Sequence, residues 1–489
     1  MATTATATTL KNFINGNWVA PSGKDLKEGV NPANTQEVIS SFYQSDIEDV
    51  NEAIDSAEKA SKFWGTTPAP QRGEYLYNIS KLMEEEKEDL ARAIVKEEGK
   101  TYNDALKEVG YAAGIVKYYA GECRRMKGMI VEADIPNVQI ETKPEALGPV
   151  LVVTPWNFPL SIPAWKTAPA IAAGNTVILK PSSETPLTAM KFIDIVNRAG
   201  VPAGVVNFVI APGKLVPDMI NHSAIKAVTF TGSNAVGKKI YAEAAKDMKR
   251  CLLEMGGKNP LIVMEDADID EAVQLAVAGA YGQTGQACTA TGRIIVHEKI
   301  AEEFTEKLVK KTEEIKVGNG LTEGVDMGPQ VNQSELQSTL NLIQSAKDEG
   351  AKVLIGGNTP KGNEYQQGYF VEPTVISEVK PWMQVAKEEI FGPVNSIIKV
   401  QDINEAITVA NDVDYGLSSA ICTKNLEYMN KALNEIEAGI VKVNMTTTGT
   451  FFQAPFGGYK QSSTGTFKEL GSEATDFYLQ YKTRYIKSV

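Results

Sequence analysis

Histidine and cysteine are scarce in this chain. Its 489 residues include two histidines, His222 and His297, and four cysteines. Two histidines leave little material for a Ser-His-Asp triad or a multi-histidine metal site, and four scattered cysteines without a CxxC pair predict neither a zinc site nor a disulfide framework. Acid–base chemistry therefore falls to carboxylates, no metal is expected, and a reducing, cytoplasmic location is favoured.

Long apolar runs and an excess of positive charge are also absent. No run reaches the roughly 18–20 residues of a membrane span, and residues 1–10 lack the basic start and apolar core of a secretion signal. The net charge of −12 repels nucleic acid and anionic membranes, so we expect neither as a partner. A chain of 489 residues exceeds one hydrophobic core, which predicts two or three domains.

Helical and strand-like segments alternate along most of the chain. Residues 46–122 have the apolar spacing of amphipathic helices. Residues 148–263 then alternate β-branched runs, from GPVLVV to NPLIVM, with helical stretches, a rhythm typical of βαβ units and a parallel sheet. A second series of the same kind follows, with the runs RIIVHE, NSIIKV and GIVKVN. We therefore predict an α/β protein with two Rossmann-type parallel-sheet domains.

Two segments outside these series predict exposed strands. Residues 129–142 alternate loosely and contain Ile and Val, which suits a hairpin. Residues 477–489, FYLQYKTRYIKSV, alternate aromatic and polar side chains and show no helix signal, which indicates an unpaired C-terminal strand that needs a partner sheet. We expect these segments to form a small β unit that bridges subunits.

Cys288 lies in the segment GQACTATGR, among small residues and glycines. Such a setting leaves the thiol unhidden and lets a ligand approach the backbone closely, which suits a nucleophile. The alternative is a buried, inert cysteine, and the other three cysteines of the chain are interpreted in that way.

Two polar residues follow strand-like runs and suit catalytic roles. Glu254, before a Gly-Gly turn in LEMGGKNP, is placed to be a partly buried acid with a raised pKa and hence a general base. Asn157, in TPWNFPL, stands among aromatic residues and prolines that would hold its amide rigidly, as an oxyanion donor requires. The alternatives are an ion-paired or capping glutamate and a turn asparagine.

Glycines and a lysine at strand ends indicate a phosphate-binding site. Phe230, Thr231, Gly232 and Ser233 lead from a strand into a predicted helix that contains Gly237, and a helix N-terminus favours phosphate. The strand NTVILK ends at Lys180, followed by Ser182 and Ser183, at the edge of the sheet where nucleotides bind. Either segment could instead be an ordinary turn, because glycine is common in strand-to-helix turns.

Taken together, these segments resemble the aldehyde dehydrogenase superfamily over nearly the whole chain. The motifs that carry the resemblance stand in the family's order and are TPWNFPL, WKTAPAIAAGNTVILKPS, FTGSNAVG, LEMGGKNP, GQACTATGR, EEIFGPV and PFGGYKQS. The resemblance implies an NAD(P)-dependent enzyme that oxidises an aldehyde to its acid through a cysteine thioester. It also implies that the fold is aldehyde dehydrogenase-like and that the chain forms a homodimer or homotetramer.

The family pattern assigns roles position by position. It makes Cys288 the nucleophile, Glu254 the general base and Asn157, with the Cys288 backbone amide, the oxyanion site, while Lys166 lines the active-site wall. A glutamate general base is not expected in a coenzyme A-acylating relative. The cofactor set that the resemblance implies is Thr154, Pro155, Trp156, Lys180, Ser182, Ser183, Gly213, Phe230, Thr231, Gly232, Ser233, Gly237, Gly256, Glu389 and Phe391. Within this set Lys180 would bind the adenine ribose, Glu389 the nicotinamide ribose, and Phe391 would position the ring.

The resemblance also bears on which cofactor is used. Many NAD-using relatives place a glutamate three residues after the lysine at position 180, whereas this chain has Ser183 there. A neutral hydroxyl beside Lys180 does not repel a 2′-phosphate, which favours NADP over NAD. The adjacent Glu184 opposes this interpretation if the loop brings its carboxylate to the ribose.

The C-terminal signature PFGGYKQSSTGTFKELG looks most like that of 2-oxoglutarate semialdehyde (2,5-dioxopentanoate) dehydrogenases. Succinate semialdehyde, glyceraldehyde and betaine aldehyde dehydrogenases are the alternatives. Succinate semialdehyde enzymes typically carry an arginine where this chain has Trp165, so a substrate carboxylate must be bound elsewhere, and the 446–453 loop is the candidate. The predicted substrate pocket contains Trp165, Thr448 and Phe452.

Two readings from other classes compete with a dehydrogenase. A cysteine hydrolase would pair Cys288 with His297, nine residues away along a predicted strand, and would leave the nucleotide motifs unexplained. A non-catalytic structural protein would have lost the nucleophile or the base. The domain division that we predict is a cofactor domain of residues 1–128 and 148–256, a catalytic domain of residues 257–447, and a bridging segment of residues 129–147 and 448–489.

Overall fold

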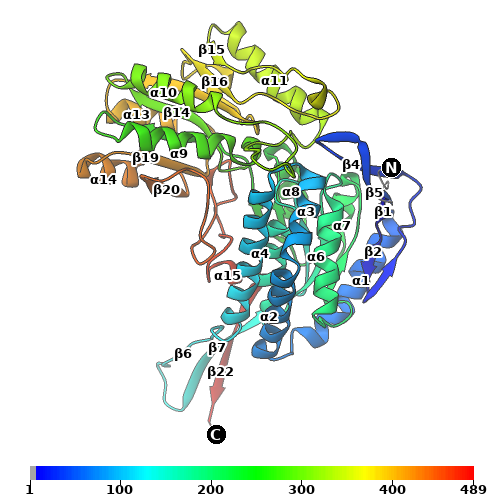
Figure 1. Ribbon diagram of the computed structural model, residues 1–489. Coiled ribbons are helices and arrows are strands. Elements are labelled where there is room, and N and C mark those ends of the chain that lie inside the picture. Colours follow the sequence, from blue (N-terminus) through cyan, green and yellow to red (C-terminus); the bar gives the residue numbers. More distant parts are fainter. Residues whose placement is uncertain (1–6, 489) are drawn as a thin grey trace.

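The computed structural model describes residues 7–488. Figure 1 shows two α/β units, with a slender sheet projecting from the lower one beside the C-terminus. Each unit contains one seven-stranded sheet, which confirms the predicted α/β class with parallel-sheet units. Among the residues described, no helix is long and apolar enough to cross a membrane.

Four helices open the first unit, as the spacing of residues 46–122 predicts. The side chain of Asp46 accepts hydrogen bonds from the first-turn amides of the first helix, and Thr101 does the same for the fourth, which satisfies donors that a helix N-terminus leaves free. The helices are α1 (Ile47–Trp64), α2 (Ala69–Glu85), α3 (Lys87–Glu98) and α4 (Tyr102–Glu122).

Short strands precede these helices. Three of them form a small separate sheet in the order β1-β5-β4, and a hairpin joins the edge of the first large sheet through the antiparallel pairing of β2 with β10. The bounds are β1 (Thr8–Thr9), β2 (Asn12–Ile14), β3 (Asn17–Val19), β4 (Leu26–Asn31) and β5 (Asn34–Tyr43).

The first large sheet has the order β12-β11-β8-β9-β10-β2-β3, and its first five strands are parallel. Every residue of β8, β9 and β11 is buried, because helices cover both faces and such strands are continuous apolar runs. The strands are β8 (Pro149–Val153), β9 (Thr176–Lys180), β10 (Val206–Phe208), β11 (Ala227–Thr231) and β12 (Arg250–Glu254), and the helices between them are α5 (Ser161–Ala172), α6 (Pro186–Arg198), η1 (Gly213–Leu215), α7 (Val216–Asn221) and α8 (Asn234–Ala245).

The second large sheet has the order β15-β16-β17-β14-β13-β19-β20, and only β15 runs antiparallel to its neighbour. The run NPLIVM, which the strand rhythm of residues 148–263 included in the first series but the predicted domain boundary at residue 257 separated from it, forms β13 near the middle of the second sheet, where it pairs with β14 and β19. The strands are β13 (Asn259–Val263), β14 (Thr291–His297), β15 (Lys352–Ile355), β16 (Thr374–Ser377), β17 (Val394–Val400), β19 (Ser418–Cys422) and β20 (Ile440–Val443).

Helices cover the second sheet as they cover the first. The helical elements of this unit are α9 (Ile269–Tyr281), η2 (Gly282–Gly285), α10 (Ala301–Glu313), α11 (Gln333–Asp348), η3 (Asn363–Tyr365), α12 (Gln384–Lys387), α13 (Ile403–Asn411) and α14 (Leu426–Glu435). The amphipathic helix α10 buries Phe304 and Leu308 at one-turn spacing, which docks it on the sheet.

The projecting sheet has the order β22-β7-β6. The predicted hairpin is present as β6 (Ile130–Val131) and β7 (Val138–Ala146), and the predicted C-terminal strand is β22 (Leu479–Lys487). Two details of that prediction were wrong. Phe477 and Tyr478 belong to the short helix α15 (Ala474–Tyr478), and β22 is not unpaired, because it pairs with β7 along its whole length. A two-stranded sheet of β18 (Tyr415–Gly416) and β21 (Tyr459–Lys460) completes the fold.

Candidate active site

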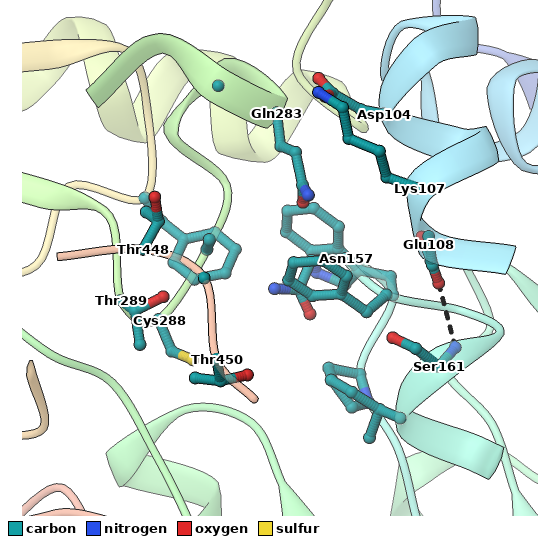
Figure 2. Close-up of a pocket in the computed structure, with 18 of the residues that line it drawn as sticks. Asp104, Lys107, Glu108, Asn157, Ser161, Gln283, Cys288, Thr289, Thr448 and Thr450 are labelled. Atoms are coloured by element: carbon teal, nitrogen blue, oxygen red, sulfur yellow. Dashed lines mark hydrogen bonds and ion pairs between the residues drawn. The ribbon is translucent and has the colours of Figure 1, made fainter. Parts of the chain in front are cut away.

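A cavity of about 900 Å³ is lined by both α/β units. The first unit contributes the loops after β8, β11 and β12, and the second contributes the segments before β14 and β17. The carboxyl edge of the first sheet, where nucleotides bind in parallel sheets, therefore faces the amino edge of the second. Figure 2 shows Cys288, Thr289 and Thr448 on one side of this cavity, with Asn157 nearer its centre.

A strained turn presents Cys288 to the cavity. Gln283 and Thr284 have positive φ angles of 53° and 58°, which side-chain-bearing residues rarely adopt. Behind the cysteine, Asn259 Nδ2 donates to the carbonyl oxygens of Cys288 and Ala290, each at 2.8 Å. Among the cysteines of residues 7–488, Cys288 alone is half-buried, and Cys123, Cys251 and Cys422 are fully buried. The turn and the Asn259 amide together fix the position of the thiol.

The surroundings of the Cys288 thiol disfavour its negative charge. Burial raises the pKa of the thiol well above its ordinary value, and the carboxylates of Glu389 and Glu254 raise it further. A thiolate at this position therefore requires a base or a compensating positive charge.

Asn157, in the loop between β8 and α5, is held by hydrogen bonds to both its side chain and its backbone. Its Nδ2 donates to the carbonyl of Gln286 at 2.9 Å, which leaves its second amide hydrogen free. The backbone carbonyl of Asn157 accepts from Lys100 Nζ at 2.8 Å, and Lys100 also forms a buried ion pair with Glu108 at 2.7 Å. Because Glu108 accepts hydrogen bonds from the first-turn amides of α5, the loop cannot move independently of α4 and α5.

Glu254 ends β12 and is buried behind the cavity wall that Met255 and Gly256 form. Its Oε1 accepts from Ser463 Oγ at 3.0 Å, while its Oε2 has no hydrogen-bond partner. Burial, followed by the charge of Glu469, holds the pKa of Glu254 well above its ordinary range. A carboxylate of raised pKa is a stronger base than an ordinary glutamate.

Part of the predicted cofactor set lines the cavity. Glu389 accepts from the backbone N–H of Gly257 at 2.9 Å, and a Cβ at Gly256 would clash with the Glu389 carboxylate. Phe391 has a positive φ of 55° and packs edge-on against Trp156 with ring centroids 5.3 Å apart. The predicted cofactor residues that line the cavity are Pro155, Trp156, Thr231, Gly232, Ser233, Gly256, Glu389 and Phe391.

The comparison with known families decides what this site belongs to. The model of the aldehyde dehydrogenase family matches residues 18–484. The chain belongs to the aldehyde dehydrogenase family. This membership confirms the prediction of an enzyme that oxidises an aldehyde to an acid with a nicotinamide cofactor. The chain is 43% identical over 480 residues to the alpha-ketoglutaric semialdehyde dehydrogenase of Bacillus subtilis (strain 168), with 98% of each chain covered.

Solved structures of other aldehyde dehydrogenases superpose closely on this chain. A 3,6-anhydro-L-galactose dehydrogenase in complex with NAP, nicotinamide adenine dinucleotide phosphate, has a TM-score of 0.95 and 38% identity, covering 98% of this chain and 100% of that one. A betaine aldehyde dehydrogenase from Staphylococcus aureus in complex with NAD+ has a TM-score of 0.94 and 34% identity, covering 97% and 94%. The two proteins carry different forms of the nicotinamide cofactor.

Several residues that the aldehyde dehydrogenase pattern singled out do not line the cavity. Lys166 is buried beneath it, where Nζ donates to Thr229 Oγ1 at 2.8 Å and pairs with Glu469. Phe452, predicted in the substrate pocket, instead packs against Tyr118 with ring centroids 5.8 Å apart. The other residues outside the cavity wall are Thr154, Lys180, Ser182, Ser183, Gly213, Phe230, Glu254 and Gly237.

The lysine and serines after β9 lie beyond the cavity wall. Lys180 Nζ donates to the carbonyl of Pro181 at 2.9 Å, and burial lowers the pKa of Lys180 to about 8. Glu184 is exposed, and its charge adds to burial in raising the pKa of Glu335, which does line the cavity. The 180–184 loop thus lies close enough to this end of the cavity for its charges to act there.

Trp165 lines the cavity as predicted and packs against Phe456 with ring centroids 5.4 Å apart. Thr450 also lines the cavity and belongs to the 446–453 loop, the predicted candidate for binding a substrate carboxylate. Tyr111 lines the cavity as well, and our sequence analysis missed it, because it stands in no motif with a chemical signature. Its one signal is weak: Tyr111 follows Lys107 by four residues, which places both on one helix face. Among residues 7–488, no group of His, Cys, Asp or Glu side chains is arranged to hold a metal ion.

Proposed function

We propose that this aldehyde dehydrogenase oxidises 2-oxoglutarate semialdehyde to 2-oxoglutarate through a thioester on Cys288. The 43% identity over nearly the full length to the Bacillus subtilis enzyme supports this substrate. The observation that carries the mechanism is the placement of Cys288 in one cavity with Asn157, Glu389 and Phe391. Nucleophile, amide donor and cofactor-binding side chains thereby share one enclosed space.

Attack on the aldehyde uses Cys288 and Asn157. The thiolate adds to the carbonyl carbon and converts the carbonyl oxygen to an oxyanion. The free amide hydrogen of Asn157, on a side chain already anchored at Gln286, donates to that oxyanion with little reorganisation. Lys100 supports this geometry, because its Nζ donates a hydrogen bond to the backbone carbonyl of Asn157.

Completion of the reaction requires a hydride acceptor and a water. A nicotinamide cofactor, when bound, would supply the hydride acceptor; the hydride leaves the tetrahedral carbon, and a thioester remains on Cys288. Glu254 then takes a proton from water, whose oxygen attacks the thioester carbon and releases the acid and the thiol. The unpartnered Oε2 and the raised pKa of Glu254 suit this role.

The residues present fit a nicotinamide dinucleotide. Glu389 would hold the ribose hydroxyls of the cofactor through its carboxylate, and the absence of side chains at Gly232 and Gly256 avoids clashes with Phe230 and Glu389. Ser183, at the position where many NAD-using relatives have glutamate, accepts a weak hydrogen bond from Gln44 Nε2 at 3.4 Å. A neutral side chain there does not repel a 2′-phosphate, and we propose NADP as the preferred cofactor. Residues 1–128 and 148–256 would form the cofactor domain, and residues 257–447 the catalytic domain.

Betaine aldehyde is a second candidate substrate. The paired rings of Trp165 and Phe456 offer aromatic faces of the kind that bind quaternary ammonium groups. The betaine aldehyde dehydrogenase from Staphylococcus aureus also shares the fold.

We also propose a homodimer or homotetramer located in the cytoplasm. The projecting sheet carries exposed apolar side chains at Ile130, Tyr485 and Ile486, and β20 is an open edge of the second large sheet. Open edges and apolar strands favour pairing with another chain. The four free cysteines fit a reducing compartment. Sedimentation of a single chain of 53.0 kDa would contradict the oligomer.

The test is a panel of reduced-nicotinamide formation at 340 nm. NAD and NADP are each combined with 2-oxoglutarate semialdehyde, succinate semialdehyde, glyceraldehyde and betaine aldehyde. We expect the highest kcat/KM with 2-oxoglutarate semialdehyde and NADP, and none in Cys288→Ala, whereas Cys422→Ala, which alters a buried cysteine of β19, serves as the control. A higher kcat/KM with betaine aldehyde or succinate semialdehyde would overturn the proposed substrate and leave the proposed mechanism standing.

A further inference from the structure

Two hydroxyl groups meet across the cavity at the end away from the proposed cofactor residues. Tyr111 Oη, from α4, and Thr450 Oγ1, from the loop between β20 and β21, lie 2.8 Å apart. Both residues line the cavity. No step of the proposed chemistry uses this pair, although both residues line the cavity that a substrate must enter.

The remaining charges of the cavity do not suit an anionic substrate. Among its lining residues, Lys107 is the single cation, against five carboxylates at Asp104, Glu108, Asp326, Glu335 and Glu389. Lys107 is already paired with Asp104 at 3.1 Å, and its side chain is largely exposed. Figure 2 shows Asp104, Lys107 and Glu108 together, on the opposite side of Asn157 from Cys288. A substrate carboxylate in this cavity therefore needs neutral donors.

The Tyr111–Thr450 pair supplies two such donors. In the free enzyme one hydroxyl donates to the other, so one hydrogen is used between them. A carboxylate is an acceptor only and has two oxygens, so both hydroxyls can turn and donate to it. Burial raises the pKa of Tyr111 to about 12, and the phenol consequently keeps its proton at neutral pH.

Packing fixes the two hydroxyls relative to each other. Phe452, two residues after Thr450, lies against the rings of Tyr111 and Tyr118 with centroids 6.0 and 5.8 Å away. The same ring fills the notch above Gly114, where an added Cβ would be 3.0 Å from Phe452. The loop is thereby docked on α4, and the hydroxyl pair is organised before substrate binds.

Resting on the proposed function, we propose that Tyr111 and Thr450 together bind the carboxylate of the substrate at the end opposite its aldehyde. In this chain the two hydroxyls would bind the carboxylate in place of the arginine that succinate semialdehyde dehydrogenases typically carry at the position of Trp165. The substrate class that the pair selects is a short aldehyde with a carboxylate at its far end.

The test compares a charged and a neutral substrate of equal length. The variants Tyr111→Phe, Thr450→Val and the double variant remove one or both hydroxyls while keeping side-chain volume. Each variant is assayed with 2-oxoglutarate semialdehyde and with pentanal, and the ratio of the two kcat/KM values is measured. Tyr118→Phe is the matched control, because it removes a phenol hydroxyl from the same helix, next to the same Phe452 ring, outside the cavity lining.

We expect each single variant to lower the charged-to-neutral ratio about tenfold and the double variant about a hundredfold, mainly through KM, because hydrogen bonds to a charged group are of this strength. Tyr118→Phe should leave the ratio unchanged. An unchanged ratio in the double variant, or equal losses with both substrates, would overturn the inference. If the wild-type enzyme itself prefers pentanal, the proposed substrate fails as well. If the wild type prefers the charged aldehyde and the double variant keeps the same ratio, only the inference fails.

Discussion

The cofactor end and the substrate end of the cavity are built from different kinds of structural element. At the cofactor end, short loops at the ends of strands carry glycines such as Gly232 and Gly256, whose missing side chains leave room beside Phe230 and Glu389. At the substrate end, the face of α4 meets a loop 339 residues later, where Tyr111 contacts Thr450. The first end depends on local backbone geometry, and the second depends on which distant segments pack together.

This difference explains which residues a sequence reveals. A glycine or a strained turn constrains its own neighbours along the chain, so it leaves a compact motif. A hydroxyl pair that forms between segments 339 residues apart leaves no local pattern. Variants at the junction of the two ends, at the cofactor end and at its outer rim should therefore have different effects.

Replacement of Glu254 by glutamine should have the largest effect on turnover. Every turnover ends with the deacylation that Glu254 is proposed to catalyse, whatever happens at the cofactor end and the substrate end before it. We expect the steady-state rate to fall about a thousandfold, the range of general base catalysis. A first-turnover burst of reduced nicotinamide, measured by stopped flow, should persist, because the hydride leaves before the hydrolysis step in which Glu254 is proposed to act. Glu473→Gln, at an exposed glutamate, is the control. Loss of burst and steady state together would place Glu254 in acylation instead.

At the cofactor end, Glu389 should make cofactor binding depend on pH. Burial raises the pKa of Glu389 to about 7, so the carboxylate that accepts ribose hydroxyls prevails above pH 7 and is lost as pH falls through this value. We expect the cofactor KM to rise between pH 8 and pH 6 in the wild type. In Glu389→Gln it should be about tenfold higher at pH 8 and nearly independent of pH.

The adjacent Glu388 offers a matched control for this experiment, because it is exposed. The Glu388→Gln variant should keep the pH dependence of the wild type. A cofactor KM that is flat from pH 8 to pH 6 in the wild type would argue that Glu389 does not bind the ribose in its ionised form.

The smallest effect is expected at the rim, where Ser183→Glu should shift the cofactor preference. A carboxylate at this position repels a 2′-phosphate and accepts the 2′-hydroxyl of NAD. The ratio of kcat/KM for NADP to that for NAD, measured with one aldehyde, should fall about tenfold. Ser223→Glu, on an exposed loop after α7, controls for the added charge. An unchanged ratio would show that the 2′ position is recognised elsewhere.

The fold was predictable to the extent that its signals are periodic. Buried parallel strands such as β8 and β9 are continuous β-branched runs, and α1 to α4 have helical spacing. The strand rhythm of residues 148–263 did not separate NPLIVM from the first series, because a strand's own residues do not state which sheet it joins. Its pairing with β14 and β19 places it in the second sheet. The C-terminal strand was recognised, but its partner β7 lies more than 300 residues earlier.

The site was predictable in part for the same reason. Cys288, Asn157 and Glu389 stand in compact motifs, and the structure brings all three to one cavity. The roles and the domain boundaries assigned to them from sequence stay predictions. Lys166 stands in such a motif as well, yet its side chain points to Glu469 rather than to the cavity, since a helix face and not a sequence position sets its direction.

The sequence by itself determined the family, the α/β class and the residue types available for chemistry. These follow from local constraints: glycines where a Cβ would clash, apolar periodicity, and a cysteine among small neighbours. Only the tertiary structure decided that Glu254 is buried beside Glu469, that Lys100 holds the Asn157 loop, and that Tyr111 meets Thr450. Burial and distant contacts set pKa values and donor geometry, and neither is encoded in the order of neighbouring residues.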